Sequence, residues 1–411
     1  MRRGFSVVSF LLVLAVFVTG CSGAPKFTPT PTRTPVPAVT PTCTAAPSPT
    51  MVGVQNATGT RMPASTSRAP GGTEMAPRPS PSAVGQVTVT PSSSKNAATP
   101  VAVPTLGRNI DVFTGLPVGD PARLDRMPVA VKIENAPAAR PQYGLNEADV
   151  VFEHLAEGGI TRFTAIFYGK DASRIGPVRS ARLIDLEIPV IMHAFFAYSG
   201  ASPPVTRKIK NSDFAEYTLS DWFGDPVFYR IKNGKAREHT LFTDTKILWN
   251  YAKKKGWRGR PPQMWSFGRT PPPGGDPAMT IFIPYSKRYS DVTYKYDPAS
   301  GKYLRWILGE KHVDALTGKQ IAVSNVAVLY VNHVKTLIVE DALGSRSIEI
   351  QLWGSGKMTL CRDGKAYSGV WVRAARHSPL QFLDQAGHPL LLKPGNTWVQ
   401  LVPLDMKVTI K

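Results

Sequence analysis

Nearly half of residues 25–105 are proline, threonine or serine, and this stretch limits where a folded core can form. It contains 16 Pro, 16 Thr and 8 Ser, and its one aromatic residue is Phe27. Proline fixes φ and removes a backbone donor, and a stretch without apolar periodicity has little to bury. We therefore predict a disordered stalk over residues 21–105 and a folded body from residue 106.

The first 20 residues have the pattern of an export signal. Arg2 and Arg3 precede an apolar stretch over residues 5–18 that is too short for a membrane span of about 20 residues. The stretch ends in Val18-Thr19-Gly20-Cys21, which resembles a bacterial lipobox. We predict a lipoprotein signal peptide over residues 1–20, lipidation of Cys21, and attachment to the extracytoplasmic face of the cell membrane. A plain secretory signal and an uncleaved transmembrane anchor are the alternatives.

The remaining residues are basic and long enough to bury a substantial core. Residues 106–411 carry 41 Lys and Arg and 28 Asp and Glu, a formal charge of +13. Export makes nucleic acid an unsuitable partner. An anionic cell-wall glycan, an anionic lipid or an envelope protein fits a basic face there. The alternative interpretation, in which the basic residues form a solvated surface without a dedicated partner, stays open. Cys361, the one cysteine beyond Cys43, is expected to be a small buried side chain.

Apolar patterns divide the body into two regions around a Pro/Gly-rich run over residues 260–276. Residues 106–260 mix short strands with helices, including an expected helix from Ala181 that stops or kinks at Pro189. Residues 277–411 contain a series of short β-type segments, with Asp363-Gly364 as a two-residue hairpin signal. The fold class is therefore predicted as α+β: a mixed α/β N-terminal lobe followed by a mainly antiparallel β C-terminal lobe.

Several short sequence segments in both regions resemble the sequences of one bacterial family. They are Ala139-Arg140-Pro141-Gln142, Ala148-Asp149-Val150-Val151-Phe152-Glu153, Glu157-Gly158-Gly159-Ile160-Thr161-Arg162-Phe163, Ile175-Gly176-Pro177-Val178-Arg179-Ser180-Ala181-Arg182, Gly369-Val370-Trp371-Val372-Arg373 and Pro394-Gly395-Asn396-Thr397-Trp398. Residues 106–411 thereby resemble the YerB-like family of bacterial lipoproteins. The resemblance implies a two-part extracytoplasmic body and no established activity. One departure is Glu238-His239-Thr240-Leu241-Phe242, where the family pattern suggests Pro-His-Asn-Leu-Tyr.

Arginines cluster around a glycine and a serine between residues 174 and 182. Arg174, Gly176, Arg179, Ser180 and Arg182 surround the expected start of a helix, where free N–H groups and guanidinium groups can bind phosphate or carboxylate. We predict an anion-binding site here. The alternative is an internal ion-pair network, and the candidate polar partners are Asp149, Glu153, Glu157, Asp185 and His239.

Catalytic motifs give weaker signals. Glu153 and Glu157 could form an acid/base pair in a hydrolase or transferase acting on an anionic wall polymer or lipid-linked precursor. His193 with Ser199 lacks the G-x-S-x-G elbow of serine hydrolases. The seven histidines show no metal-ligand spacing, so neither a metal nor a cofactor is predicted. Whether the chain is an enzyme stays open, and we predict a cell-envelope binding module.

Overall fold

The computed structural model describes residues 105–411. The predicted signal peptide, Cys21 and the stalk up to residue 104 lie outside the described residues. Between residues 105 and 411, no helix combines the length and apolar character needed to span a membrane.

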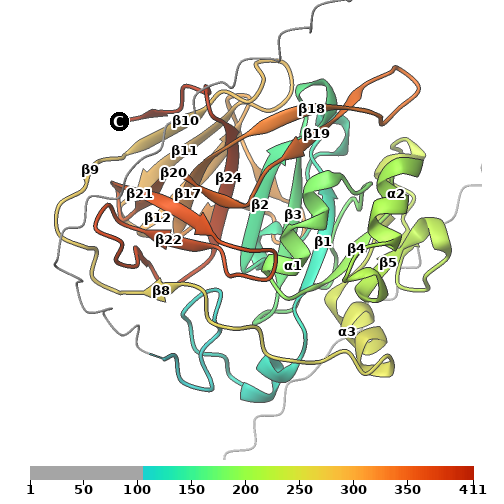
Figure 1. Cartoon of the computed structure of the whole chain (residues 1–411), viewed down its shortest axis with the longest axis horizontal. Coiled ribbons are helices and arrows are strands. Elements are labelled where there is room, and N and C mark those ends of the chain that lie inside the picture. Colours follow the sequence, from blue (N-terminus) through green and yellow to red (C-terminus); the bar gives the residue numbers. More distant parts are fainter. Residues whose placement is uncertain (1–104) are drawn as a thin grey trace, which may run out of the picture. The chain divides into compact units, whose positions relative to one another are not determined.

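One large mixed sheet takes strands from both halves of the body (Figure 1). A short strand, β9 (Asp276–Pro277), pairs with β21 beside the main path. The order along the sheet is β22 (Gln381–Leu383), β21 (Lys365–Arg373), β20 (Gly354–Arg362), β17 (Asn325–Val331), β24 (Thr397–Pro403), β2 (Val150–Leu155), β3 (Thr161–Phe167), β1 (Val129–Glu134), β4 (Phe195–Tyr198) and β5 (Thr218–Ser220).

Strand direction gives this sheet a shared carboxyl edge. β17, β24 and β2 are mutually parallel, and β1, β4 and β5 are also parallel to one another. Because β3 is antiparallel to both β2 and β1, the two groups run in the same direction. The carboxyl ends of six strands therefore meet along one edge, which is where open sheets of this kind usually bind ligands.

Alternation along the strands gives the sheet two buried faces. Val129, Val131 and Ile133 of β1 point to one core, whereas Ala130 points to the other. Successive side chains of a strand point to opposite faces, so the mainly apolar sequence of β1 is covered on both sides. Lys132 shares the face of Ala130 and is fully buried, which makes it an exception that needs a polar partner.

A second sheet and the three α-helices cover these faces. Leu248 of α3 (Thr245–Lys254) packs in the core with Val131, as do residues of the second sheet. Ile188 and Val205, from α1 (Ile188–Ile191) and α2 (Pro203–Lys210), pack in the opposite core. The second sheet has the order β13 (Glu310–Lys311), β12 (Lys302–Ile307), β11 (Val292–Asp297), β10 (Thr280–Ile283) and β25 (Thr409–Ile410), with β16 (Ala322–Val323) pairing β12.

Smaller elements complete the body. The two-stranded pairs are β6 (Tyr229–Arg230) with β7 (Leu241–Phe242), β8 (Ser266–Phe267) with β23 (Leu391–Leu392), β14 (Val313–Asp314) with β15 (Lys319–Gln320), and β18 (His333–Val339) with β19 (Arg346–Ile350). Short 3-10 helices span Pro121–Asp125, Pro137–Ala139, Leu145–Glu147, Glu157–Gly159, Leu183–Leu186, Ala215–Tyr217, Asp221–Phe223 and Arg237–His239.

The prediction of a helix that begins at Ala181 and stops or kinks at Pro189 is wrong. A 3-10 helix occupies Leu183–Leu186, and α1 begins at Ile188 with Pro189 in its first turn. Proline is tolerated there because the first N–H groups of a helix have no intrahelical partner. The backbone of residues 178–181 instead hydrogen-bonds to neighbouring strands and loops, so the arginines do not lie at the start of a regular helix.

The fold class is confirmed as α+β, and several local predictions are confirmed with it. Asp363 and Gly364, both with positive φ, form the two-residue turn between β20 and β21. Cys361 is buried and free, and burial raises the pKa of its thiol. The parallel pairing of β24 with both β17 and β2 was not predicted, because strands joined by short turns indicate antiparallel neighbours.

Candidate anion-binding site

A cavity of about 600 Å³ lies at the carboxyl edge formed by β4 and β5. Ser199 and Gly200 follow directly after β4, and Asp221 and Trp222 follow β5, so the parallel pairing of these strands places the four residues together. The cavity is lined by Val178, Arg179, Ser180, Ser199, Gly200, Ala201, Asp221, Trp222, Arg230, Arg237, Glu238 and Leu241.

Arg179 is held at the cavity by its own backbone. Its N–H donates to the carbonyl of Lys132 in β1 at 2.9 Å, and its carbonyl accepts from the N–H of Ser199 at 3.0 Å. Its Nε is ion-paired with Oε2 of Glu134, whose side chain is almost fully buried. The Arg179 side chain is 28% exposed, so part of the guanidinium group remains accessible from the cavity.

Two further arginines come from the segment between β5 and β7. Arg230 is paired with Asp221 at 2.7 Å and donates from Nη1 to the carbonyl of Arg237 at 2.8 Å. These bonds hold the loop that carries Arg237 against the cavity. Arg237 is exposed and forms no ion pair among residues 105–411, so its charge is free to meet an incoming anion.

Two hydroxyl groups face each other beside these cations. The Oγ atoms of Ser180 and Ser199 are 3.5 Å apart, and the carbonyl of Ser180 accepts from Arg162 at 2.8 Å. Because the hydroxyl hydrogens can rotate, both groups can donate to one oxyanion. Guanidinium and hydroxyl donors together form the strong, charge-assisted bonds that hold phosphate and carboxylate groups.

Trp222 provides an aromatic surface at the same cavity. Trp222 is 79% exposed, and its backbone N–H donates to the carbonyl of Ser199 at 2.9 Å. Gly200 permits this approach, since a Cβ atom there would lie 3.2 Å from the Cβ of Trp222. An exposed indole beside polar donors can pack against the apolar face of a ligand.

The other residues of the predicted arginine cluster point elsewhere. Arg182 is buried, with Nε 2.6 and 2.7 Å from the two carboxylate oxygens of Glu157. Arg174 lies over the ring of Tyr143, 5.3 Å from its centroid. Gly176 has a φ of 147°, and a Cβ atom there would be 3.0 Å from the carbonyl oxygen of Leu241. Of the five predicted anion-binding residues, the structure therefore brings Arg179 and Ser180 into the cavity.

The predicted polar partners of the arginine cluster also lie at different places in the structure. Asp149 accepts from the N–H groups of Tyr168 and Gly169, at 2.7 and 2.9 Å. Glu153 is fully buried and lies 2.7 Å from Arg305 of β12. His239 is buried beside Glu238, which lines the cavity.

Glu157 is the predicted partner whose carboxylate pairs with an arginine side chain of the cluster, that of Arg182, whereas Asp185 accepts from the backbone N–H of Arg182. Burial alone would raise the pKa of Glu157, but the hydrogen bond and charge of Arg182 outweigh it and lower that pKa. Glu134, the partner of Arg179, was missed by sequence reasoning because only the strand order reveals this contact.

A buried polar network around Lys132 of β1 was also missed. Lys132 Nζ lies 2.6 Å from His154 Nε2, 3.0 Å from Thr164 Oγ1 and 2.7 Å from Asp185 Oδ2. Burial lowers the pKa of Lys132 to about 8, although the Asp185 carboxylate opposes that shift. Burial and the charge of Lys132 lower the pKa of His154 well below its usual value. The available signal was a lysine within the otherwise apolar run of β1.

The arrangement of side chains in the described residues does not fit a metal site. Among residues 105–411, no three His, Cys, Asp or Glu side chains come together as metal ligands. The polar groups that line the cavity are guanidinium, hydroxyl and indole groups, together with the carboxylates of Asp221 and Glu238.

The chain is thus an α+β protein with a cationic cavity at the carboxyl edge of a mixed sheet, and comparison with known proteins gives its family. Residues 113–258 match "Protein of unknown function (DUF3048) N-terminal domain", and residues 281–399 match the corresponding C-terminal domain. The chain belongs to this family, which confirms the YerB-like resemblance.

Two relatives define the similarity further. The chain is 31% identical over 283 residues to "Putative lipoprotein YerB" of Bacillus subtilis strain 168, covering 68% of this chain and 82% of that protein. The crystal structure of YerB protein from Bacillus subtilis superposes with a TM-score of 0.63 at 28% identity. That match covers 73% of this chain and 99% of the YerB chain.

Proposed function

We propose that this protein is a lipid-anchored module on the outer face of the cytoplasmic membrane that binds an anionic glycan of the cell envelope. The observation that carries the proposal is the convergence of Arg179, Arg237, Ser180 and Ser199 on one cavity. Phosphate or carboxylate groups of the glycan are the anions that these donors fit.

Anchoring and location are supported by the sequence and by a relative. The apolar stretch over residues 5–18 leads directly into the lipobox-like Val18-Thr19-Gly20-Cys21. The similar protein of Bacillus subtilis carries "lipoprotein" in its name. Two or more acyl chains on Cys21 would hold the chain firmly at a bilayer, whereas one chain binds only weakly.

The glycan is favoured over a small free anion because of Trp222. Its exposed indole lies next to the arginine and serine donors of the cavity. A sugar ring presents an apolar face of C–H groups that can pack on such a ring, while its charged substituent reaches the guanidinium groups. The +13 charge of residues 106–411 would also attract a polyanion at long range.

The geometry favours binding over the hydrolase or transferase alternative. Glu153 and Glu157, the acids predicted to act as base, are paired with Arg305 and Arg182. Neither glutamate lines the cavity that holds Arg179 and Ser180. A general base must reach the proton it removes, so these two carboxylates are poorly placed to act on a ligand bound there.

Calorimetric titration with a short glycerol-phosphate oligomer tests the proposal. The full chain with Cys21→Ala, which removes the acylation site, should bind the oligomer. Arg237→Ala should weaken binding by about tenfold to a hundredfold, since a hydrogen bond to a charged group contributes roughly 1.5–3 kcal/mol. Arg288→Ala is the matched control, because Arg288 is an exposed arginine outside the cavity.

A second variant tests the sugar component. Trp222→Ala should weaken binding of a glycosylated phosphate oligomer more than binding of inorganic phosphate. Equal binding by wild type, Arg237→Ala and Arg288→Ala would reject the proposal that this cavity binds the anion. Equal loss of both ligands in Trp222→Ala would reject the indole as a sugar-binding surface.

A further inference from the structure

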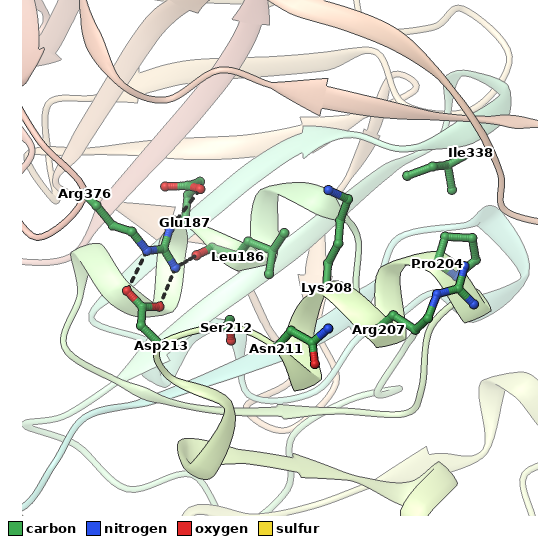
Figure 2. A pocket seen from close by; sticks show the side chains of 10 residues that line it. All are labelled: Leu186, Glu187, Pro204, Arg207, Lys208, Asn211, Ser212, Asp213, Ile338 and Arg376. Atoms are coloured by element: carbon green, nitrogen blue, oxygen red, sulfur yellow. Dashed lines mark hydrogen bonds and ion pairs between the residues drawn. The ribbon is translucent and has the colours of Figure 1, made fainter.

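A groove of about 840 Å³ lies beside α2 (Figure 2). We call it the α2 groove, and it is bordered by α2, by the 3-10 helix before α1 and by β18. Its lining residues are Leu186, Glu187, Pro204, Arg207, Lys208, Asn211, Ser212, Asp213, Ile338 and Arg376. None of these residues lines the cavity at the carboxyl edge, so the α2 groove is a distinct feature of the surface.

One side of α2 forms a wall of this groove. Pro204 is followed after three, four and seven residues by Arg207, Lys208 and Asn211, and this spacing places all four on the same side of a helix. The other side of α2 packs in the hydrophobic core, which fixes the orientation of the helix. The exposed side of α2 therefore presents two cations and an amide to the groove.

The carboxylates of the groove are already paired, whereas two of its cations are not. Glu187 and Asp213 lie 3.1 and 2.7 Å from Arg376. In Figure 2 dashed lines join both carboxylates to Arg376, and no dashed line reaches Arg207 or Lys208. No carboxylate between residues 105 and 411 forms an ion pair with either of these two cations. The unpaired charge of the groove is therefore positive, and it can attract an external anion.

The cavity and the α2 groove approach each other at the first turn of α2. Ala201 lines the cavity, and Pro204 lines the groove. Because consecutive Cα atoms are about 3.8 Å apart, the Cα atoms of these two residues are separated by at most about 11 Å. Lys208 lies about 6 Å further along the helix axis than Pro204. A chain of a few repeating units can therefore reach from the cavity to the unpaired cations of the groove, whereas a single phosphate group cannot.

We propose that the ligand is an extended polyanion that occupies both places: one anionic group binds in the cavity, and later groups of the same chain bind Arg207 and Lys208 in the α2 groove. This inference rests on the proposed function, which supplies the anionic glycan. Leu186, Pro204 and Ile338 add apolar contact area, which suits a chain with C–H groups between its charges. Once the first group is bound, the second contact is intramolecular, so weak bonds to exposed cations add measurable affinity.

Titration of the full chain carrying Cys21→Ala with glycerol phosphate and with a long glycerol-phosphate oligomer tests this extended site. Wild-type residues at the groove should make the oligomer bind more tightly than glycerol phosphate. Arg207→Ala combined with Lys208→Ala should weaken binding of the oligomer by about tenfold, because two exposed ion pairs are lost. The same double variant should affect glycerol phosphate far less, since that ligand fits within the cavity. Ligand-observed NMR follows the weaker binding of glycerol phosphate.

Lys253→Ala combined with Lys254→Ala is the matched control, because it removes the same charge from the exposed end of α3, outside both the cavity and the groove. Thermal melts should show wild-type stability for both double variants, since all four side chains are exposed. Equal losses of oligomer binding in the two double variants would mean that only net charge matters, and would overturn the groove site.

Arg237→Ala separates failure of this inference from failure of the proposed function. If Arg237→Ala weakens both ligands while the groove variant weakens neither, the cavity binds the anion and the extended site is rejected. If Arg237→Ala leaves both ligands unaffected, the proposed function fails and the extended site fails with it. Loss of oligomer binding in both variants, with glycerol phosphate sensitive mainly to Arg237→Ala, is the result that the extended site predicts.

Discussion

Arg182 lies against Glu157 with its Nε 2.6 Å from one carboxylate oxygen and 2.7 Å from the other. Three residues earlier, Arg179 lines the cavity at the carboxyl edge and keeps 28% of its side chain exposed. One short segment therefore supplies both an internal ion pair and a ligand-facing cation. The two hypotheses drawn from the sequence apply to different arginines of the same cluster.

This division predicts unequal losses of stability. Arg182→Ala should lower the free energy of unfolding by about 3–5 kcal/mol, because it leaves the nearly buried carboxylate of Glu157 without a partner. Arg237→Ala, at an exposed arginine without an ion pair, should change it by less than about 0.5 kcal/mol. Urea unfolding followed by tryptophan fluorescence measures both, and equal effects would show that the pairing of Arg182 is not structural.

The buried histidine of β2 should make stability depend on pH. The pKa of His154 is lowered well below its usual value by burial and by Lys132, so the native state keeps it neutral. In the unfolded chain its pKa is about 6.5, so below that pH the unfolded state binds the extra proton. His154 therefore lowers the free energy of unfolding by about 1.4 kcal/mol for each pH unit below 6.5.

Comparison with His154→Gln isolates this contribution, because all other titrating groups are shared. The variant should be less stable than wild type at pH 7.5, where it loses native packing and hydrogen bonding of the imidazole. The difference in the free energy of unfolding between wild type and variant should narrow as the pH falls from 6.5 to 5. A gap that stays constant over this range would mean that His154 is protonated in the native state.

The buried pair between β2 and β12 should couple the two regions of the chain. Glu153 and Arg305 are fully buried and 2.7 Å apart, and Arg305 also lies 3.0 Å from His312. Arg305→Met should destabilise the protein by about 3–5 kcal/mol, because it leaves Glu153 charged and unpaired in the core. The variant with both Arg305→Met and Glu153→Gln should recover part of the loss. Differential scanning calorimetry gives these values, and an Arg305→Met variant as stable as wild type would contradict the coupling.

Lipid anchoring gives a cellular prediction. Cys21→Ala should leave an unprocessed precursor or release the protein from the membrane fraction, because the acceptor thiol is absent. Fractionation and immunoblotting of cells that express either form measure this outcome. Cys43→Ala is the matched control, since Cys43 lies outside the lipobox-like motif. Normal processing and full membrane retention of Cys21→Ala would reject the lipoprotein prediction.

Local structure was predicted well where a short pattern determines it. Residues 277–411 contain the short strands expected from their apolar segments, and Asp363-Gly364 forms the expected β20–β21 turn. In each case the interacting atoms lie within a few residues, so sequence spacing carries the information.

The candidate site depends on contacts between residues that lie far apart in the chain, and sequence spacing does not reveal such contacts. Arg179 meets Glu134 because β1 lies between β3 and β4, and Arg237 reaches the cavity because Arg230 binds its carbonyl. The expected start of a helix at Ser180 was replaced by backbone bonds to β1 and to the segment after β4. Strand order across the sheet decides such contacts, and a single sequence with regular apolar patterns does not specify that order.

The most direct test of the anion-binding account is a crystal structure of the protein soaked with phosphate. The account predicts one phosphate in the cavity, within hydrogen-bond distance of Arg179 or Arg237 and of the hydroxyl of Ser180 or Ser199. Arg237→Ala crystals soaked at the same concentration should show reduced occupancy. Phosphate absent from this cavity, or bound equally in wild type and Arg237→Ala, would contradict the account.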